Sequence, residues 1–128
     1  MLESIADTLE RRSTSLVLIS HDIGVVKGMC DELVVMYAGE VFESGPTAVI
    51  FSDPKHPYTR GLIAAFSATG KPQYIPGLVP SLHRVFTGCA FADRCRVADT
   101  LCRTVAPQLR SLEDGRLVAC HKAEEPAT

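Results

Sequence analysis

A run of four apolar residues, Leu16–Ile19, limits most strongly how this chain can fold. The run is too short for a helix, and an unbroken apolar stretch is typical of a strand buried on both faces of a sheet. Residues 2–12, just before it, repeat apolar residues at helical spacing and carry their charges on the opposite face. A helix followed by a buried strand is the pattern of a parallel α/β sheet, so the predicted fold class is α/β.

Short elements joined by tight turns follow this run. The predicted helices cover residues 23–30, 45–51 and 58–68, and two predicted strands cover residues 33–36 and 40–43. Asp22 precedes the first of these helices and has the kind of side chain that caps helix N-termini. Gly39 lies between the two strands. Tight turns between strands need positive φ angles, which glycine adopts easily, so the strands are expected to form a β-hairpin.

The last part of the chain, from residue 69 onward, has a different composition. Prolines and glycines interrupt it, and no helical or strand periodicity is sustained. We therefore divide the chain into residues 1–68, a regular α/β segment, and residues 69–128, an irregular segment. The length of 128 residues suits one modest domain, or part of a domain with an appendage.

The charge balance and the apolar runs exclude several classes of protein. The 13 Lys and Arg residues against 15 Asp and Glu residues lack the basic excess of a nucleic-acid-binding protein. No apolar run reaches the roughly 20 residues that span a bilayer, so an integral membrane protein is not indicated. Residues 1–12 are amphipathic and acidic, unlike a signal peptide. We expect the chain to work in a reducing cytoplasm.

The chain has five cysteines, and in the cytoplasm clustered cysteines indicate metal or redox chemistry more often than disulfides. Four of them fall in the last third of the chain: Cys89, Cys95, Cys102 and Cys120. Their spacing, C-x5-C-x6-C-x17-C, contains no C-x2-C pair, so a zinc ribbon is not indicated. Cys30 stands apart and is expected to be a small core residue.

Three interpretations of the four late cysteines stay open. Four thiolates can hold a 4Fe-4S cluster or a tetrahedral zinc ion. The wide, irregular loops fit a cluster better, because its irons spread the ligands further apart than one metal ion does. The third interpretation is four reduced or partly paired structural cysteines. His121, beside Cys120, could add a fifth ligand but is more often a bystander.

His21 is the first candidate for a catalytic residue. It follows the predicted buried strand, at the end of the strand where open α/β sheets bind their ligands. From there its ring could donate a hydrogen bond to a phosphate oxygen. The alternative is a histidine packed at the start of a helix and paired with Asp22, and position alone favours that alternative.

Three stretches of the sequence resemble one family. L-I-S-H-D at residues 18–22 and D-E-L-V-V-M-Y-A-G-E-V at residues 31–41 resemble the end of the nucleotide-binding domain of ABC ATPases. F-S-D-P-K-H-P-Y-T-R-G-L at residues 51–62 is similar to the N-P-x-H-P-Y-T-x-x-L signature of the oligopeptide/dipeptide (peptide/nickel) group of ABC transporters. The four late cysteines resemble that group's C-terminal extension. The chain thus looks like the C-terminal part of an ATP-binding subunit.

This resemblance implies a fold, a role for His21 and a set of partners. Residues 1–68 would be the C-terminal part of a P-loop NTPase core, and residues 69–128 a small irregular extension that carries cysteines. In an intact subunit His21 would be the switch histidine, which contacts the γ-phosphate of ATP, and the family's nucleotide is ATP with Mg²⁺. Some members of the group resemble carriers of a 4Fe-4S cluster in the extension. The implied partners are transmembrane permease subunits, a second ATPase subunit and, indirectly, a solute-binding protein, at the cytoplasmic, inner face of the cell membrane.

Several motifs of a complete ATPase do not occur in this sequence. They are the G-x-x-x-x-G-K-S/T phosphate-binding loop (Walker A), the L-S-G-G-Q signature and the apolar strand ending in Asp-Glu (Walker B). Without a lysine and a magnesium site His21 has no positioned phosphate to act on, so we expect a truncated subunit, inactive as an ATPase by itself. His56 is expected to be structural, since its two flanking prolines suit a rigid turn. The alternative function is a stand-alone iron–sulfur or metal-binding module.

Overall fold

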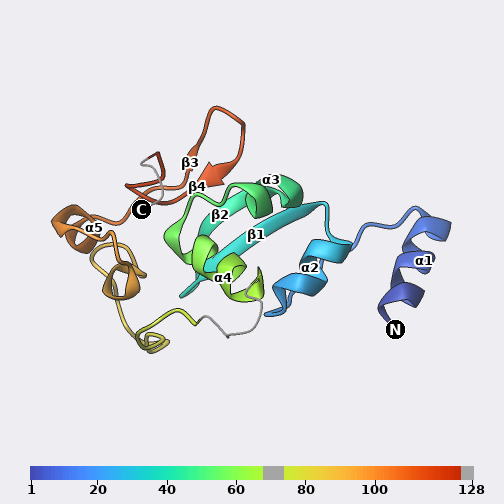
Figure 1. Ribbon diagram of the computed structural model, residues 1–128, viewed down its shortest axis with the longest axis horizontal. Coiled ribbons are helices and arrows are strands. Elements are labelled where there is room, and N and C mark those ends of the chain that lie inside the picture. Colours follow the sequence, from blue (N-terminus) through green and yellow to red (C-terminus); the bar gives the residue numbers. More distant parts are fainter. Residues whose placement is uncertain (68–73, 125–128) are drawn as a thin grey trace.

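The structure, a computed structural model, describes residues 1–67 and 74–124. Its helices are α1 (Leu2–Arg12), α2 (Ile23–Met29), α3 (Thr47–Ser52), α4 (Pro57–Ser67) and α5 (Thr100–Thr104), with a 3-10 helix, η1, at Ala92–Arg94. Its strands are β1 (Glu32–Tyr37), β2 (Glu40–Pro46), β3 (Arg110–Ser111) and β4 (Leu117–Val118). Figure 1 shows α1 at one end of the molecule and α5 at the other, with the sheet between them.

One small sheet lies at the centre of the fold. Its strand order is β1-β2-β4-β3, and every neighbouring pair is antiparallel. The α/β class is therefore confirmed, whereas the expectation of parallel strands is wrong for the described part of the chain. The physical reason for two of the three pairs is that β1 and β2, and likewise β3 and β4, are joined by short turns, which make neighbouring strands antiparallel.

The predicted β-hairpin is confirmed. Tyr37 pairs with Glu40, so the turn has two residues, Ala38 and Gly39, with φ angles of 49° and 81°. Positive φ at both positions is the type I′ pattern, whose twist matches that of the flanking strands. Glycine adopts such an angle without steric cost, and Gly39 therefore marks the turn in the sequence.

The predicted strand over Leu16–Ile19 is wrong. Residues 14–20 have no regular secondary structure, and the side chains of Val17 and Ile19 are 89% and 95% exposed. A strand needs a neighbour that pairs its backbone N–H and C=O groups, and none of the described strands pairs with this segment. Leu18 is half-buried and packs against the core that the hairpin shares with its helices.

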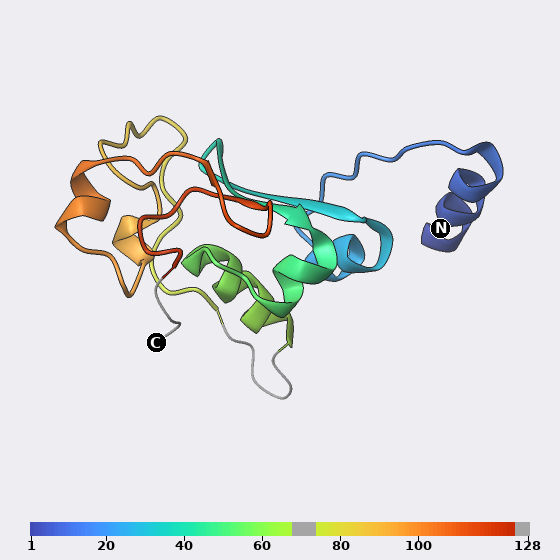
Figure 2. The same cartoon turned by 90° about the horizontal axis from the view of Figure 1, so that it is seen from above.

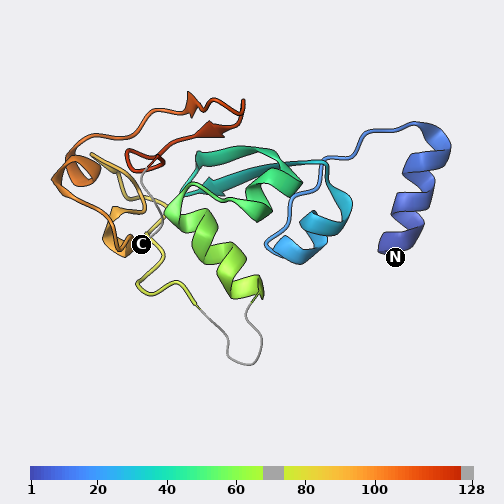
Figure 3. The ribbon, with the colours of Figure 1, turned by 45° about the horizontal axis from the view of Figure 1, so that its top comes forward.

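Helices α2, α3 and α4 cover one face of the hairpin, as Figure 3 shows. Residues along β1 alternate between exposed and buried. The buried Leu33 and Val35 form a core with Val26 of α2 and Ile50 of α3. Because successive side chains of a strand point to opposite faces, this alternation leaves β1 with one covered face.

The helices that cover this face agree with the sequence prediction. Asp22 caps α2, where its Oδ1 accepts the N–H of Gly24 at 3.0 Å and the N–H of Val25 at 3.3 Å. The segment predicted over 45–51 corresponds to α3, but its first two residues, Gly45 and Pro46, belong to β2. The segment predicted over 58–68 corresponds to α4, and Ala68 lies outside the described residues. Cys30 is half-buried beside the core, as expected.

Helix α1 matches the predicted amphipathic helix, but none of its residues is buried. It ends at Ser13, whose φ of 50° is left-handed. In Figures 1 and 2 the helix stands apart from the other elements, joined to them by the irregular segment that contains Leu16–Ile19. Among the described residues, the packed part of the chain therefore begins near α2.

A second core joins the hairpin to the last third of the chain. Tyr37 and Phe42 of the hairpin pack with Ala90 and Phe91. Strand β4 also pairs with β2, and Figure 2 shows the last third of the chain against the end of the hairpin that is remote from α1. The predicted boundary between residues 68 and 69 lies outside the described residues, and the segments on either side share a sheet and a core.

Candidate functional site

The four late cysteines line one small cavity. Its volume is about 10 Å³, which is room for about one water molecule. Its wall is formed by His56, Pro57, Cys89, Phe91, Ala92, Cys95, Ala98, Cys102, Pro107, Cys120, His121 and Lys122. The fold thus brings together the four cysteines that the sequence singles out, from loops before and after η1, from α5 and from the segment after β4.

Backbone hydrogen bonds hold the loops of Cys89 and Cys102 together. The N–H of Cys89 donates to the carbonyl oxygen of Cys102 across 2.7 Å, and the carbonyl oxygen of Cys89 accepts the N–H of Ala92 at 3.1 Å. Asp99 caps α5, and its Oδ1 accepts the N–H of Cys102 at 3.0 Å. These two cysteines are therefore placed by backbone geometry, and not only by side-chain packing.

Asp99 also connects the Cys120 segment to α5. Its Oδ2 lies 2.7 Å from Nζ of Lys122, and the N–H of Lys122 donates to Sγ of Cys120 across 3.3 Å. The hydrogen bond from Lys122, followed by the N–H of Cys102, lowers the pKa of Asp99. One carboxylate thus stays ionised and positions the segments of two of the four cysteines.

All five cysteines are free thiols. Burial raises the pKa of Cys89 and of Cys102, and it raises the pKa of Cys120 to about 11. The charges of the neighbouring cysteines raise these pKa values further, because thiolates this close together repel one another. These three thiols are therefore protonated at neutral pH, and a metal would have to displace their protons.

The arrangement of donors does not match a single metal ion. Within residues 1–67 and 74–124, no three His, Cys, Asp or Glu side chains are grouped so that they could hold one. Tetrahedral zinc needs its thiolate ligands at about 2.3 Å. The four thiols share one cavity wall, but among the described residues they do not form such a group.

His56 forms part of the cavity wall. It also holds the turn between Pro54 and Pro57, where the sequence predicts a structural role for it. Its side chain is 1% exposed, and its ring stacks on Phe42 with centroids 4.1 Å apart and planes 12° apart. Nδ1 accepts the N–H of Tyr58 at 3.0 Å, and the main-chain N–H of His56 donates to Oε2 of Glu43 at 3.0 Å. These contacts agree with the predicted structural role.

One atom of His56 stays unsatisfied. Among the described residues Nε2 has no hydrogen-bond partner, although it is buried. Burial, followed by the charge of Arg60, lowers the pKa of His56 from 6.5 to about 3, so the ring is neutral. An unpaired buried polar atom costs about 1–3 kcal/mol of stability.

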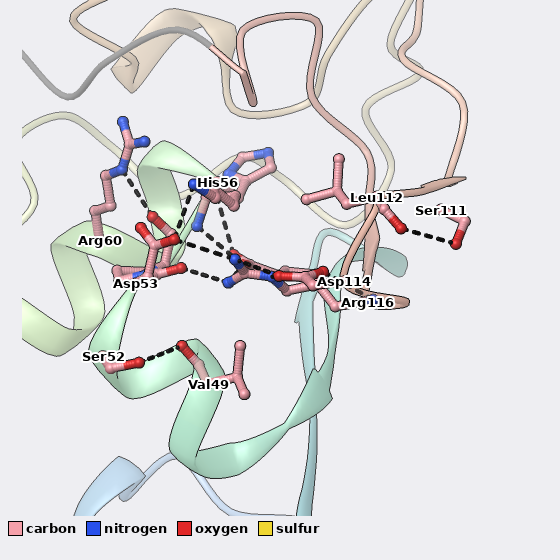
Figure 4. Close-up of polar contacts among 12 residues, drawn as sticks. Val49, Ser52, Asp53, His56, Arg60, Ser111, Leu112, Asp114 and Arg116 are labelled. Atoms are coloured by element: carbon pink, nitrogen blue, oxygen red, sulfur yellow. Dashed lines mark hydrogen bonds and ion pairs between the residues drawn. The ribbon is translucent and has the colours of Figure 1, made fainter.

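A buried ion-pair network lies under this turn, as Figure 4 shows. Arg116 is 2% exposed, and its Nη1 lies 3.5 Å from Oε1 of Glu43, which is fully buried. The same guanidinium donates to the carboxylate of Asp114 at 3.0 Å, to that of Asp53 at 3.2 Å and to the carbonyl oxygen of Asp53. Glu43 in turn accepts the N–H groups of Lys55 and His56. Arg116 thus fastens the segment next to β4 onto the turn before α4.

His21, the predicted catalytic residue, lies far along the chain from this cavity and is not among its wall residues. It is exposed, directly before the cap of α2. In the described part of the chain its side chain makes no hydrogen bond or ion pair, and Asp22 is occupied by the backbone of α2. The structure therefore brings the four cysteines together and leaves His21 separate.

Sequence reasoning missed three features of the site. The H-P-Y turn draws attention to His56 but does not show that His56 shares a cavity wall with the cysteines. Glu43 and Arg116 are charged residues, which usually lie at the surface. The residues next to them in sequence give no sign that either side chain is buried. A hairpin glycine or a cysteine spacing is a local signal, whereas these contacts join residues far apart in the chain.

Comparison with known proteins matches most of the chain. A family model described as "Oligopeptide/dipeptide transporter, C-terminal region" matches residues 42–102, which run from β2 to α5. The "Oligopeptide transport ATP-binding protein OppD" of Salmonella typhimurium is 42% identical over 117 residues, 88% of this chain and 35% of that protein. The "Probable peptide ABC transporter ATP-binding protein y4tR" of Sinorhizobium fredii is 37% identical over 130 residues, 98% of this chain and 39% of that protein. The "Oligopeptide transport ATP-binding protein AppD" of Bacillus subtilis is 38% identical over 129 residues, 98% of this chain and 39% of that protein.

These matches place the chain among the ATP-binding proteins of ABC transporters. Within that class it belongs to the oligopeptide/dipeptide family, whose C-terminal region it contains. The chain spans between about a third and two fifths of the length of these relatives. In the described residues no helix combines the length and the apolar character that crossing a membrane requires.

Proposed function

We propose that this chain supplies the switch-histidine end and the C-terminal region of the ATP-binding subunit of an ABC importer for peptides. The observation that carries the proposal is the match of residues 42–102 to the oligopeptide/dipeptide family, a range that includes the turn that His56 anchors. The names of the relatives support ATP as the nucleotide and peptides as the cargo.

In such a subunit His21 would face the nucleotide. Its exposed side chain precedes the capped N-terminus of α2, so it is free to contact a phosphate that other parts of the subunit position. A histidine there can donate a hydrogen bond to the γ-phosphate, and ATP with Mg²⁺ supplies the energy of transport. Because the phosphate-binding motifs do not occur in these residues, the chain alone is not expected to hydrolyse ATP. Permease subunits and a second ATPase subunit are its proposed partners, at the cytoplasmic face of the membrane.

Peptide uptake tests this proposal. In cells that lack the gene for the ATP-binding subunit, a subunit that contains the wild-type chain should restore uptake of a labelled oligopeptide. The His21→Ala variant should lower uptake by about 10²-fold, the usual loss for one transition-state donor. His83→Ala is the matched control, since His83 is also exposed and does not belong to the segment that precedes α2. Uptake that is unaffected by deletion of the gene, or equal in both variants, would contradict the proposal.

A second proposal concerns the cavity: Cys89, Cys95, Cys102 and Cys120 hold a 4Fe-4S cluster. Two observations support it: four thiols share one cavity wall, and the buried Nε2 of His56 has no hydrogen-bond partner among the described residues. The donor set fits a cluster, which is held by four thiolates and supplies one-electron transfer when bound. The chain's part would be to exclude water by burial and to give up the thiol protons. This site would also support the alternative of a stand-alone iron–sulfur module.

Anaerobic reconstitution with iron and sulfide tests the cluster. The wild-type chain should take up equal amounts of both and become brown, and Cys102→Ser should lose most of that uptake because Cys102 is buried in the cavity wall. Cys30→Ser is the control, because Cys30 packs against the other core. Colourless protein with bound zinc, or with no metal, would reject the cluster.

A further inference from the structure

The unpaired nitrogen of His56 is the strongest unexplained feature of the molecule. The residue is 1% exposed, and its Nε2 is one of few buried side-chain polar atoms that have no hydrogen-bond partner among the described residues. Buried polar groups in folded proteins are nearly always paired, so an exception needs an explanation. Pro54 and Pro57 restrict the backbone of the turn that carries this ring. Movement of the turn is therefore a poor explanation for the missing hydrogen bond.

The hydrogen bond at the other ring nitrogen decides which nitrogen carries the proton. Nδ1 accepts the N–H of Tyr58 at 3.0 Å and is therefore unprotonated. In a neutral imidazole one nitrogen carries the proton, so Nε2 carries it here and is a donor. A nitrogen in this state has no lone pair for a metal, and His56 cannot act as a fifth ligand without losing the bond to Tyr58.

The ring cannot turn away to find another partner. It stacks on Phe42 at 4.1 Å between centroids, and the main-chain N–H of His56 is held by the buried carboxylate of Glu43. Figure 4 shows the ring on the side of His56 that is away from Arg116 and the ion-pair network. The cavity whose wall includes His56 also has all four thiols in its wall. Sulfur atoms in the same cavity wall are therefore candidate acceptors for Nε2–H.

We propose that His56 donates a hydrogen bond from Nε2 to a sulfur of the group that the four cysteines hold, and so sets its reduction potential. This inference rests on the proposed cluster at the same site. His56 is a positioning residue that acts on the sulfurs and not a ligand. Hydrogen bonds to the sulfurs of a cluster stabilise its more negative, reduced form, so they raise the reduction potential.

The reduction potential of reconstituted variants tests the inference. His56→Phe keeps an aromatic ring for the stack on Phe42 but removes the donor, and its potential should be more negative than that of the wild type, with the same iron content. His56→Gln, which retains an N–H donor, should recover part of the shift. His121→Phe is the matched control, because His121 is also in the cavity wall but its Nε2 already contacts the carbonyl oxygen of Val105 at 2.7 Å. Its potential should equal that of the wild type.

The outcomes separate this inference from the cluster proposal. If the wild type takes up no iron and sulfide, both fail. If it takes them up and His56→Phe has the wild-type potential, the cluster stands and the role of His56 is overturned. If His56→Phe does not fold, the wild type labelled with isotopic nitrogen in histidine decides: the reduced cluster should show hyperfine coupling to one histidine nitrogen, and no coupling would overturn the inference.

Discussion

The Arg116→Met variant is expected to lose about 3–5 kcal/mol of unfolding free energy relative to the wild type. The side chain of Arg116 is 2% exposed, and that of its partner Glu43 is fully buried. Methionine replaces the stem of the arginine but leaves the buried carboxylate without its opposite charge. The loss is measured as a lower midpoint of urea-induced unfolding, followed by circular dichroism.

Arg110→Met is the matched control for this prediction. Arg110 forms an ion pair with Glu124 at 2.9 Å, but the two side chains are 41% and 74% exposed, so the expected loss is about 0–1 kcal/mol. A double variant, Arg116→Met with Glu43→Gln, removes both buried charges and should lose less than the two single variants together. Equal midpoints for Arg116→Met and Arg110→Met would show that the buried network does not stabilise the fold.

The Gly88→Ala variant is expected to lose about 3 kcal/mol of unfolding free energy, the upper end of the range of about 1–3 kcal/mol for overpacked sites. It is also expected to lose the ability to take up iron and sulfide. A Cβ at residue 88 would lie 2.3 Å from the carbonyl oxygen of Cys102 and 2.5 Å from the carbonyl carbon of Arg103. Both are backbone atoms, so no side-chain rotation relieves the clash. The loops of Cys89 and Cys102 would have to separate, which breaks the 2.7 Å hydrogen bond between them.

Gly28→Ala is the control for this substitution. Gly28 lies in the exposed part of α2, and a Cβ there meets nothing within 4 Å. Alanine has a higher helix propensity than glycine, so this variant should gain about 0.5–1 kcal/mol and keep its iron uptake. Wild-type stability and iron uptake in Gly88→Ala would refute the close approach of the two loops.

The parts of the fold with local signals are the parts that the sequence predicts. The cap at Asp22 and the turn at Gly39 depend on residues within a few positions of each other, and both are confirmed. The strand predicted over Leu16–Ile19 is wrong because apolar composition cannot supply a hydrogen-bonding neighbour. The buried pair of Glu43 and Arg116 could not be predicted either, since nothing local distinguishes it from a solvated ion pair.

The candidate site divides in the same way. The four cysteines are conspicuous in sequence, and the structure places all of them around one cavity. What they bind stays a prediction. The role of His21 also stays a prediction, because its proposed partner is a nucleotide that other residues must position. The orientation of His56 depends on contacts with Phe42 and Glu43, which only the folded chain brings together.

The pairing of β2 with β4 has a consequence for the order in which the molecule can assemble. Glu43 lies opposite Val118, so a strand near the end of the chain returns to a hairpin formed near its beginning. Closing so long a loop costs entropy before any contact offsets it, and such contacts form late. Cys120 comes two residues after this pairing, so we expect the cavity to close late in folding. A cofactor that needs all four cysteines would therefore be loaded into a nearly finished protein.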